Sequence, residues 1–144
     1  MHIVTLSKAH KKALLRFYKS QHYPISYMGF DTCYVLADSP SVNNENDMLA
    51  AAFCSEINPE YGYTFLHGVV VKTQHQHQGL GSILVKHAIN QHRNIYCFAD
   101  AKLTPFYLQL NFVKKTQSNL PTSLCNRLKS YQVKHPNLVA FIHP

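Results

Sequence analysis

The sequence has no tryptophan, only five glycines, and seven acidic residues against 14 lysines and arginines. Its net charge of +7, with the histidines neutral, predicts an anionic partner such as nucleic acid, anionic lipid or a phosphorylated cofactor. No apolar run approaches the roughly 20 residues that a membrane-spanning helix needs. Nothing at the start resembles a secretion signal. We therefore expect a cytoplasmic protein that does not associate with membranes.

Cysteine is scarce as well, and its four copies stand singly: Cys33, Cys54, Cys97 and Cys125. No pair has the close spacing of a structural zinc site, and no pattern suggests a disulfide framework, so reduced thiols are expected. The sequence His75-x-His77 is the closest pair of metal-ligating residues, and it lacks a third ligand of known type. We expect no bound metal.

What the sequence does contain is an alternation of strand and helix patterns over 144 residues, which favours a single α/β domain spanning residues 1–144. Residues 116–144 carry the weakest pattern and are expected to form a helix and a strand. The expected strands are His2–Leu6, Thr32–Ala37, Met48–Ile57, Tyr63–Val71, Ile95–Ala99, Phe112–Lys115 and Leu138–Ile142. The expected helices are Lys8–Lys19, Gly79–His92, Thr104–Leu110 and Pro121–Lys134.

The most informative segment is the bend between the strand Tyr63–Val71 and the helix that follows. Here Gly79 and Gly81 allow a turn that exposes successive backbone N–H groups, while the helix directs its positive dipole end at the same point. Such a bend binds phosphate or pyrophosphate. The alternative is an ordinary turn in which the two glycines only relieve backbone strain. The segment fits neither a P-loop nor a dinucleotide fingerprint.

Two motifs here carry a family resemblance. Gln76-x-x-Gly79-x-Gly81 is similar to the acyl-CoA-binding motif of the GNAT N-acetyltransferases, and Phe106-Tyr107-x-x-x-Asn111-Phe112 is similar to that family's second signature. The resemblance covers about residues 48–115 and extends to the N-terminal strand and helix, whereas residues 116–144 match nothing in the family pattern. It implies a single-domain GNAT-like fold, with a mixed, mostly antiparallel sheet flanked by helices. It also implies transfer of an acetyl group from acetyl-CoA to a primary amine by direct attack.

The resemblance further implies which residues bind acetyl-CoA. They are Val69, Val70 and Val71 of the strand, Gln76, His77, Gln78, Gly79, Leu80, Gly81 and Ser82 of the bend, and Asp100 and Phe106 downstream. Two positions depart from the family pattern: Asp100 stands where asparagine is usual, and Asn111 replaces a glycine. Asparagine tolerates a left-handed backbone better than most residues, so we expect the turn at Asn111 to persist.

Acetyl transfer needs a base for the amine and an acid for the departing thiolate. The resemblance points to Tyr107 as the acid, and a phenol with a usual pKa of about 10 is protonated at neutral pH. His67 is the first candidate base, because strand alternation places it on the face of Val69 and Val71 and imidazole titrates near neutral pH. The alternative is a structural histidine that is hydrogen-bonded in the sheet. Glu56 is the rival base.

Other interpretations stay open. The same fold can serve as a non-catalytic acyl-CoA-binding or sensing module, and the basic charge alone suggests a nucleic-acid-binding protein, although no nucleic-acid-binding motif is present. The acceptor is a small-molecule or peptide amine of unspecified identity. We expect its pocket between the Tyr23–Phe30 loop and the Glu56–Tyr63 turn. A monomer and a homodimer are both compatible with the sequence.

Overall fold

The computed structural model describes residues 1–25, 31–57 and 62–144. Its centre is a seven-stranded sheet in the order β1-β2-β3-β4-β5-β7-β6. The strands are β1 (His2–Thr5), β2 (Thr32–Ala37), β3 (Met48–Ile57), β4 (Tyr63–Val71), β5 (Ile95–Asp100), β6 (Val113–Lys115) and β7 (Leu138–His143). Strands β4 and β5 run parallel and every other neighbouring pair runs antiparallel. The expected mixed, mostly antiparallel sheet is therefore confirmed.

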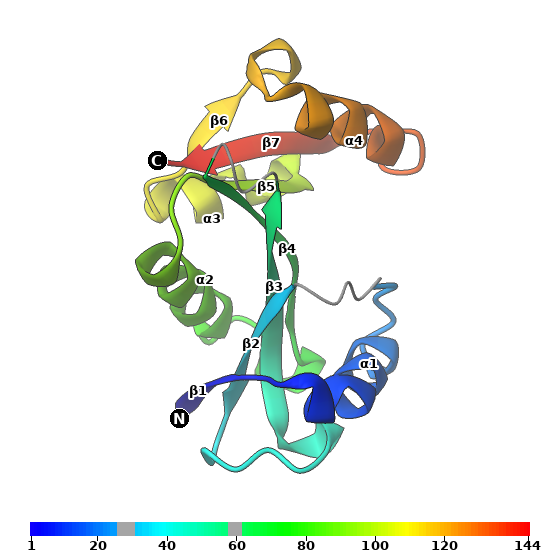
Figure 1. Ribbon diagram of the computed structural model, residues 1–144, viewed down its shortest axis with the longest axis vertical. Helices are drawn as coiled ribbons and strands as arrows, with labels where there is room; N and C mark the ends of the chain where they lie inside the picture. Colours follow the sequence, from blue (N-terminus) through cyan, green and yellow to red (C-terminus); the bar gives the residue numbers. More distant parts are fainter. Residues whose placement is uncertain (26–30, 58–61) are drawn as a thin grey trace.

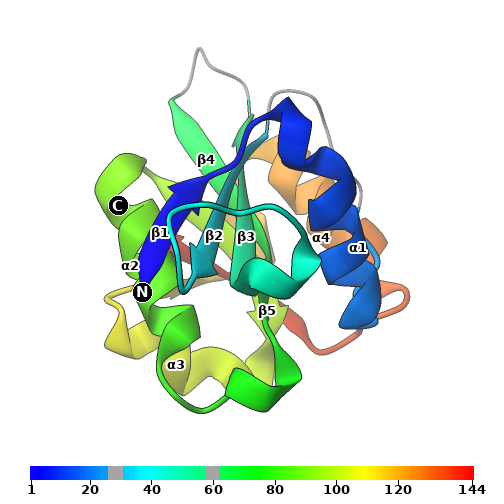
Figure 2. The same cartoon turned by 90° about the horizontal axis from the view of Figure 1, so that it is seen from below.

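Four α-helices within the described residues cover the two faces of this sheet. They are α1 (Lys11–Ser20), α2 (Leu80–Gln91), α3 (Thr104–Gln109) and α4 (Thr122–Gln132). Helices α1 and α4 lie on one side, and α2 and α3 lie on the other (Figure 1). Figure 2 shows α1 and α2 on opposite sides of strands β1 to β3. No helix in the described part of the chain is long and apolar enough to cross a membrane.

The core is divided by the sheet in the same way. Under α2 and α3, residues such as Leu84 and Tyr107 pack against the strands in one cluster. On the opposite face, Phe17 of α1 belongs to a second cluster and Leu124 of α4 to a third. Because both faces of the central strands are covered, β2 and the first eight residues of β3 are almost wholly buried.

Most expected elements are found, and three strands match their expected limits: Thr32–Ala37, Met48–Ile57 and Tyr63–Val71. The expected strand–helix–strand unit is formed by β4, α2 and β5. The expected first helix is divided into a 3-10 turn, Lys8–His10, and α1. The turn expected at residues 58–60 lies outside the described residues.

Strand β4 departs from regular geometry at its middle. Opposite β3, His67 pairs with Phe53 while Val70 pairs with Ala51, so β4 contains one extra residue in between. Gly68 lies in this bulge with a φ of 63°, in the left-handed region. A Cβ atom there would lie 2.7 Å from Cδ1 of Ile25, so the backbone angle favours glycine and a larger residue would also have to displace the end of the Ile25 side chain.

Beyond this bulge, β4 also separates from β5. The parallel ladder between the two strands contains only three pairs, from Thr64–Ile95 to Leu66–Cys97. The second half of β4 pairs with β3 alone. Its other edge therefore faces a gap rather than a neighbouring strand, and this gap lies beside the start of α2.

Candidate active site

A pocket of about 670 Å³ lies between the second half of β4, the start of α2 and helix α3. This volume is in the range of small-molecule and cofactor sites. Fourteen residues line it: Val69, Val71, Gln76, His77, Gly79, Leu80, Gly81, Ser82, Lys86, Leu103, Phe106, Tyr107, Gln109 and Leu110. The structure thus brings together nine of the twelve residues expected to bind cofactor and the expected acid.

The bend that begins α2 has the geometry of an anion site. Gly79 is its N-cap, with a φ of 81° that places it in the left-handed region. The first intrahelical hydrogen bond runs from the N–H of Ile83 to the carbonyl of Gly79, 3.2 Å away. The N–H groups of Leu80, Gly81 and Ser82 precede it, in the first turn where a helix supplies no acceptor. They carry the positive end of the helix dipole to the pocket wall.

The two glycines of the bend have different roles. At Gly79 an added Cβ atom would have nothing within 4 Å, so its backbone angle is what requires glycine. Gly81 lies within the helix, where an added Cβ would lie 3.5 Å from Cγ2 of Val71 and 3.7 Å from Cζ of Phe106. These are ordinary contacts. Gly81 therefore keeps the pocket wall open rather than relieving strain.

Gln76 holds the bend against the strand. Its side-chain amide donates a hydrogen bond to the carbonyl oxygen of Val71, 3.2 Å away. Lys86, one helical turn after Ser82 in α2, adds a positive charge to the pocket lining. An anionic ligand would thus meet an ammonium group, helix N–H groups and an aromatic side chain in one pocket.

Three residues expected to bind the cofactor lie outside the lining. Val70 points to the opposite face, where it packs against the α1 cluster. Gln78 is exposed in the bend. The Asp100 carboxylate accepts a hydrogen bond from the N–H of Lys102, 3.0 Å away, and so caps the turn before α3.

Tyr107 is the most buried polar side chain of the pocket, with 5% of its surface exposed. Its ring stacks on Phe141 at 5.0 Å and meets the edges of Phe106 and Phe112. Burial raises the pKa of the Tyr107 hydroxyl well above its usual value, and the nearby Cys97 thiol raises it further. The phenol therefore keeps its proton at neutral pH.

Asn111, where the family pattern has glycine, adopts the expected left-handed conformation, with a φ of 67°. The following N–H, from Phe112, donates to the carbonyl oxygen of Tyr107, 3.1 Å away. This closes the end of α3 and lets the chain turn into β6. The replacement therefore leaves the turn that positions Tyr107 intact.

His67 lies on the opposite face of the sheet from the one we expected. Val69 and Val71 pack against the α2 and α3 cluster, whereas the His67 ring is stacked between Phe53 and Phe65 on the α1 and α4 face. The prediction of a shared face was wrong because the extra residue at Gly68 reverses the alternation. An isolated glycine inside a strand pattern is the sequence signal for such a bulge.

Beneath His67 lies a polar pair that the sequence did not reveal. Nε2 of His67 is 2.8 Å from Oγ of Ser55, and the Ser55 hydroxyl donates a hydrogen bond to the carboxylate of Asp31. The Asp31 side chain is fully buried, whereas 23% of the His67 side chain is exposed. Burial lowers the pKa of His67, Asp31 opposes this, and Arg127 of α4 lowers it further.

Glu56 lies apart from this arrangement. It is exposed near the end of β3 and is not among the pocket-lining residues. Its electrostatic influence falls on His92, at the end of α2 distant from the glycine bend, where it raises the pKa against the lowering effect of burial. Among the described residues, no group of three or more His, Cys, Asp or Glu side chains is arranged to hold a metal ion.

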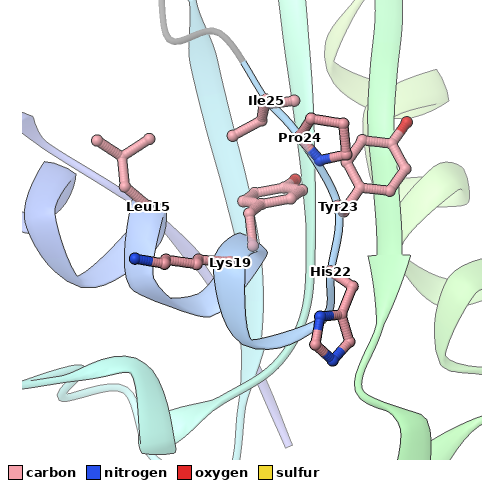
Figure 3. Close-up of a pocket in the computed structure, with 7 residues that line it drawn as sticks. Leu15, Lys19, His22, Tyr23, Pro24 and Ile25 are labelled. Atoms are coloured by element: carbon pink, nitrogen blue, oxygen red, sulfur yellow. The ribbon is translucent and has the colours of Figure 1, made fainter.

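A second hollow, of about 460 Å³, opens on the α1 side of the sheet. Its wall runs from Leu15 and Lys19 of α1 to the segment His22–Ile25, as Figure 3 shows. Tyr18 also lines it and donates a hydrogen bond to the carbonyl oxygen of Gly68 in the β4 bulge. Tyr23 is part of the expected acceptor pocket, whereas residues 26–30 and 58–61 of that prediction lie outside the described residues.

Comparisons with known proteins agree with this geometry. The sequence model of the Acetyltransferase (GNAT) family matches residues 6–112. No curated protein sequence matches the chain. Among solved structures, Escherichia coli ElaA is similar, with a TM-score of 0.69 and 13% identity over 99% of this chain and 97% of that one.

Two further solved structures are similar at comparable identity. N-acetylglutamate synthase from Neisseria gonorrhoeae, complexed with coenzyme A and N-acetyl-glutamate, has a TM-score of 0.65 and 14% identity over 99% of this chain. The present chain spans only 35% of that synthase. A dodecameric spermidine N-acetyltransferase from Vibrio cholerae has a TM-score of 0.61 and 14% identity over 80% of each chain. At these identities the likeness shows the fold alone.

Proposed function

Because the chain belongs to the GNAT family of acetyltransferases, we propose that it transfers the acetyl group of acetyl-CoA to a primary amine by direct attack. The observation that carries this proposal is the single pocket in which the glycine bend, the first turn of α2 and the hydroxyl-bearing ring of Tyr107 meet. A structural neighbour complexed with coenzyme A supports the choice of donor.

The donor fits the pocket in two parts. The diphosphate lies at the start of α2, where the N–H groups of Gly81 and Ser82 and the Lys86 ammonium complement its charge. The pantetheine arm runs along the edge of β4 that faces away from β3, where the backbone of Val69 and Val71 is not paired with β5. The negative charge of a phosphorylated donor also complements the net positive charge of the chain.

Tyr107 acts as the general acid. Its pKa is raised by burial, so the hydroxyl holds a proton that the departing thiolate accepts. Burial also raises the pKa of the adjacent Cys97 thiol, which keeps this thiol protonated and poorly nucleophilic. Direct attack by the amine is therefore favoured over an acyl-cysteine intermediate.

His67 acts as the general base from the other face of the sheet. Strands β4 and β5 are paired only as far as Leu66, and His67 is the next residue of β4, so it lies where the two strands begin to separate. Tyr23, on the α1 side, lies near enough to raise the pKa of Tyr107. The amine thus approaches from the side of α1 and α4, opposite the donor. His67 is neutral at pH 7 because burial lowers its pKa.

The experiment is a thiol-release assay with acetyl-CoA over several classes of amine. We expect Tyr107→Phe to lower kcat by roughly 100-fold or more while the affinity for coenzyme A persists. Tyr96→Phe is the matched control, because Tyr96 lies on β5 and packs in the α4 cluster. Saturable coenzyme A binding without turnover of any amine would instead identify a non-catalytic acyl-CoA-binding module.

The base is assigned by comparing His67→Gln with Glu56→Gln at several pH values. We expect the His67 variant to lose most of kcat/KM and to lose the acidic limb of the pH profile. A larger loss in the Glu56 variant would transfer the role of base to Glu56.

A further inference from the structure

His67, Ser55 and Asp31 form a chain of polar groups on the α1 and α4 side of the sheet, leading from the partly exposed imidazole to the buried carboxylate. The Ser55 oxygen lies between the other two groups, 2.8 Å from Nε2 of His67 and hydrogen-bonded to the Asp31 carboxylate. Nε2 of His67 is also 3.9 Å from Oδ2 of Asp31. Phe53 and Phe65 stack on the imidazole, each with a centroid distance of 5.4 Å. The ring is thus held on its two faces and at one nitrogen.

The proton count in this chain fixes the tautomer of His67. A serine hydroxyl has one proton, and that of Ser55 goes to the Asp31 carboxylate. The Ser55 oxygen is then an acceptor toward His67, so Nε2 must carry the imidazole proton. Nδ1 keeps its lone pair, and among the residues that the structure describes none is hydrogen-bonded to it. An unprotonated nitrogen is what a general base requires.

We propose that Ser55 and Asp31 are positioning residues for catalysis, which hold His67 in the tautomer whose Nδ1 takes the proton of the acceptor amine. This inference rests on the proposed function. The amine nitrogen bonds to the thioester carbonyl carbon as the carbon–sulfur bond breaks. One N–H proton passes to Nδ1 of His67, and the Tyr107 hydroxyl proton passes to sulfur. Proton exchange with water then restores both residues, and nothing is oxidised or reduced.

The buried carboxylate gives the chain its energetic role. When Nδ1 takes a proton the imidazole becomes cationic, and burial between two phenylalanine rings disfavours that charge. Asp31 opposes this cost through Ser55, and it raises the pKa of His67. The other charged group that acts on the ring is Arg127, reaching from α4, which lowers this pKa. Tyr18 approaches from α1 and is uncharged, since burial raises its pKa.

Ser55 itself is not placed to act as a nucleophile. Its oxygen is engaged by His67 and its proton by Asp31, and 8% of the residue is exposed. In a nucleophilic triad the serine stands at the end of the chain, next to the histidine, rather than between histidine and carboxylate. The chain instead resembles an orienting arrangement in which the histidine is terminal and faces the reacting group.

Nitrogen-15 NMR of the protein labelled at histidine tests the tautomer without any assay of activity. The His67 signal is assigned by its absence in His67→Asn. We expect the wild type to carry its proton on Nε2, and Ser55→Ala to populate both tautomers. Ser55→Thr keeps the hydroxyl and should restore the Nε2–H form. A wild-type proton on Nδ1, with Nε2 unprotonated, would overturn the proposal.

The pH dependence of kcat/KM then tests the catalytic role. In Asp31→Asn the Ser55 hydroxyl still has an oxygen acceptor but the charge is gone, so the midpoint of the acidic limb should move to lower pH and kcat/KM should fall roughly 10- to 100-fold. Ser123→Ala is the matched control: its hydroxyl meets Tyr63 at 3.0 Å, away from His67. A purely structural role would lower the melting temperature but leave the midpoint unmoved, which would refute the proposal.

Failure of the proposed function would look different from failure of this inference. If the wild type released no thiol with any amine, the proposed reaction would be wrong even with the Nε2–H tautomer observed, and the catalytic role of Ser55 would fall with it. If the wild type turned over but Asp31→Asn kept both its rate and its midpoint, only the positioning role would be refuted.

Discussion

The sharpest test of the donor site is a pair of substitutions two residues apart, Gly79→Ala and Gly81→Ala. Both replace a glycine of the bend by the smallest chiral residue. If the bend were only a tight turn, both would act on stability alone. If it seats a diphosphate, the two variants should separate, because the backbone needs glycine at one position and the ligand needs it at the other.

The structure gives the magnitude for each variant. At position 79 the φ of 81° makes an L-residue costly, by about 1–2 kcal/mol, although the space around it is open. At position 81 alanine makes ordinary contacts and favours the helix by about 0.5–1 kcal/mol over glycine. For a domain of this size 1 kcal/mol is about 3–4 °C in Tm. Gly79→Ala should therefore melt several degrees below the wild type, and Gly81→Ala at the same temperature or slightly above it.

For donor affinity we expect the opposite ranking: Gly81→Ala should lose more affinity than Gly79→Ala. The Cβ atom at position 81 would lie near Val71 and Phe106, in the pocket wall that we propose receives the donor. Displacing a charged group from helix N–H groups costs about 1.5–3 kcal/mol, or roughly 10- to 100-fold in affinity. Differential scanning fluorimetry with and without coenzyme A and the KM for acetyl-CoA measure both effects. A KM for Gly81→Ala within twofold of the wild type would refute the placement of the diphosphate.

Two further predictions concern helix α4, which lies beyond the matched family region. Leu124→Ala should destabilise the fold by about 2–5 kcal/mol, because this side chain is fully buried, whereas Val133→Ala, at an 83% exposed position, should change Tm by less than 2 °C. Equal melting temperatures would mean that α4 does not unfold with the sheet. Arg127→Gln should move the acidic limb of kcat/KM to higher pH, because the guanidinium lowers the pKa of His67. Lys129→Gln, exposed on the same helix, is the control, and a shift to lower pH in the Arg127 variant would contradict the reasoning.

The strands that carry the site were predictable because their residues have strong preferences. Met48–Ile57 and Tyr63–Val71 are rich in β-branched, aromatic and small apolar residues, and their ends are found at the predicted residues. The ends of the helices shift by up to three residues, the largest shift being at the start of α1, where Lys8–His10 form a 3-10 turn, because terminal turns are often irregular. The position of β7 between β5 and β6 was not predicted, since strand order depends on pairing between distant segments.

The proposed donor half of the site was also predictable, because most of its residues are contiguous. The bend from Gln76 to Ser82 combines a glycine at a left-handed angle with the start of a helix, and both signals are local. The proposed acceptor half was not predictable, because Asp31, Ser55 and His67 come from three segments that meet only in the folded sheet. The one available signal was Ser55 itself, a polar residue in an apolar strand, because a buried hydroxyl implies a partner.

Gly68 lies between the proposed donor and acceptor halves of the site. Its bulge explains why strand alternation placed His67 on the wrong face of the sheet. Without the extra residue of the bulge, His67 would lie on the face of Val69 and Val71, toward the donor pocket and away from Ser55. With it, the imidazole faces the α1 and α4 side of the sheet, opposite Val69 and Val71, which line the proposed donor pocket. The proposed acid, Tyr107, comes from α3 on the donor side, so it is the bulge that separates the proposed base from the acid, by turning His67 to the opposite face of the sheet. The bulge lies where β4 leaves β5, and the hydrogen bond from the Tyr18 hydroxyl to the Gly68 carbonyl oxygen holds it in place.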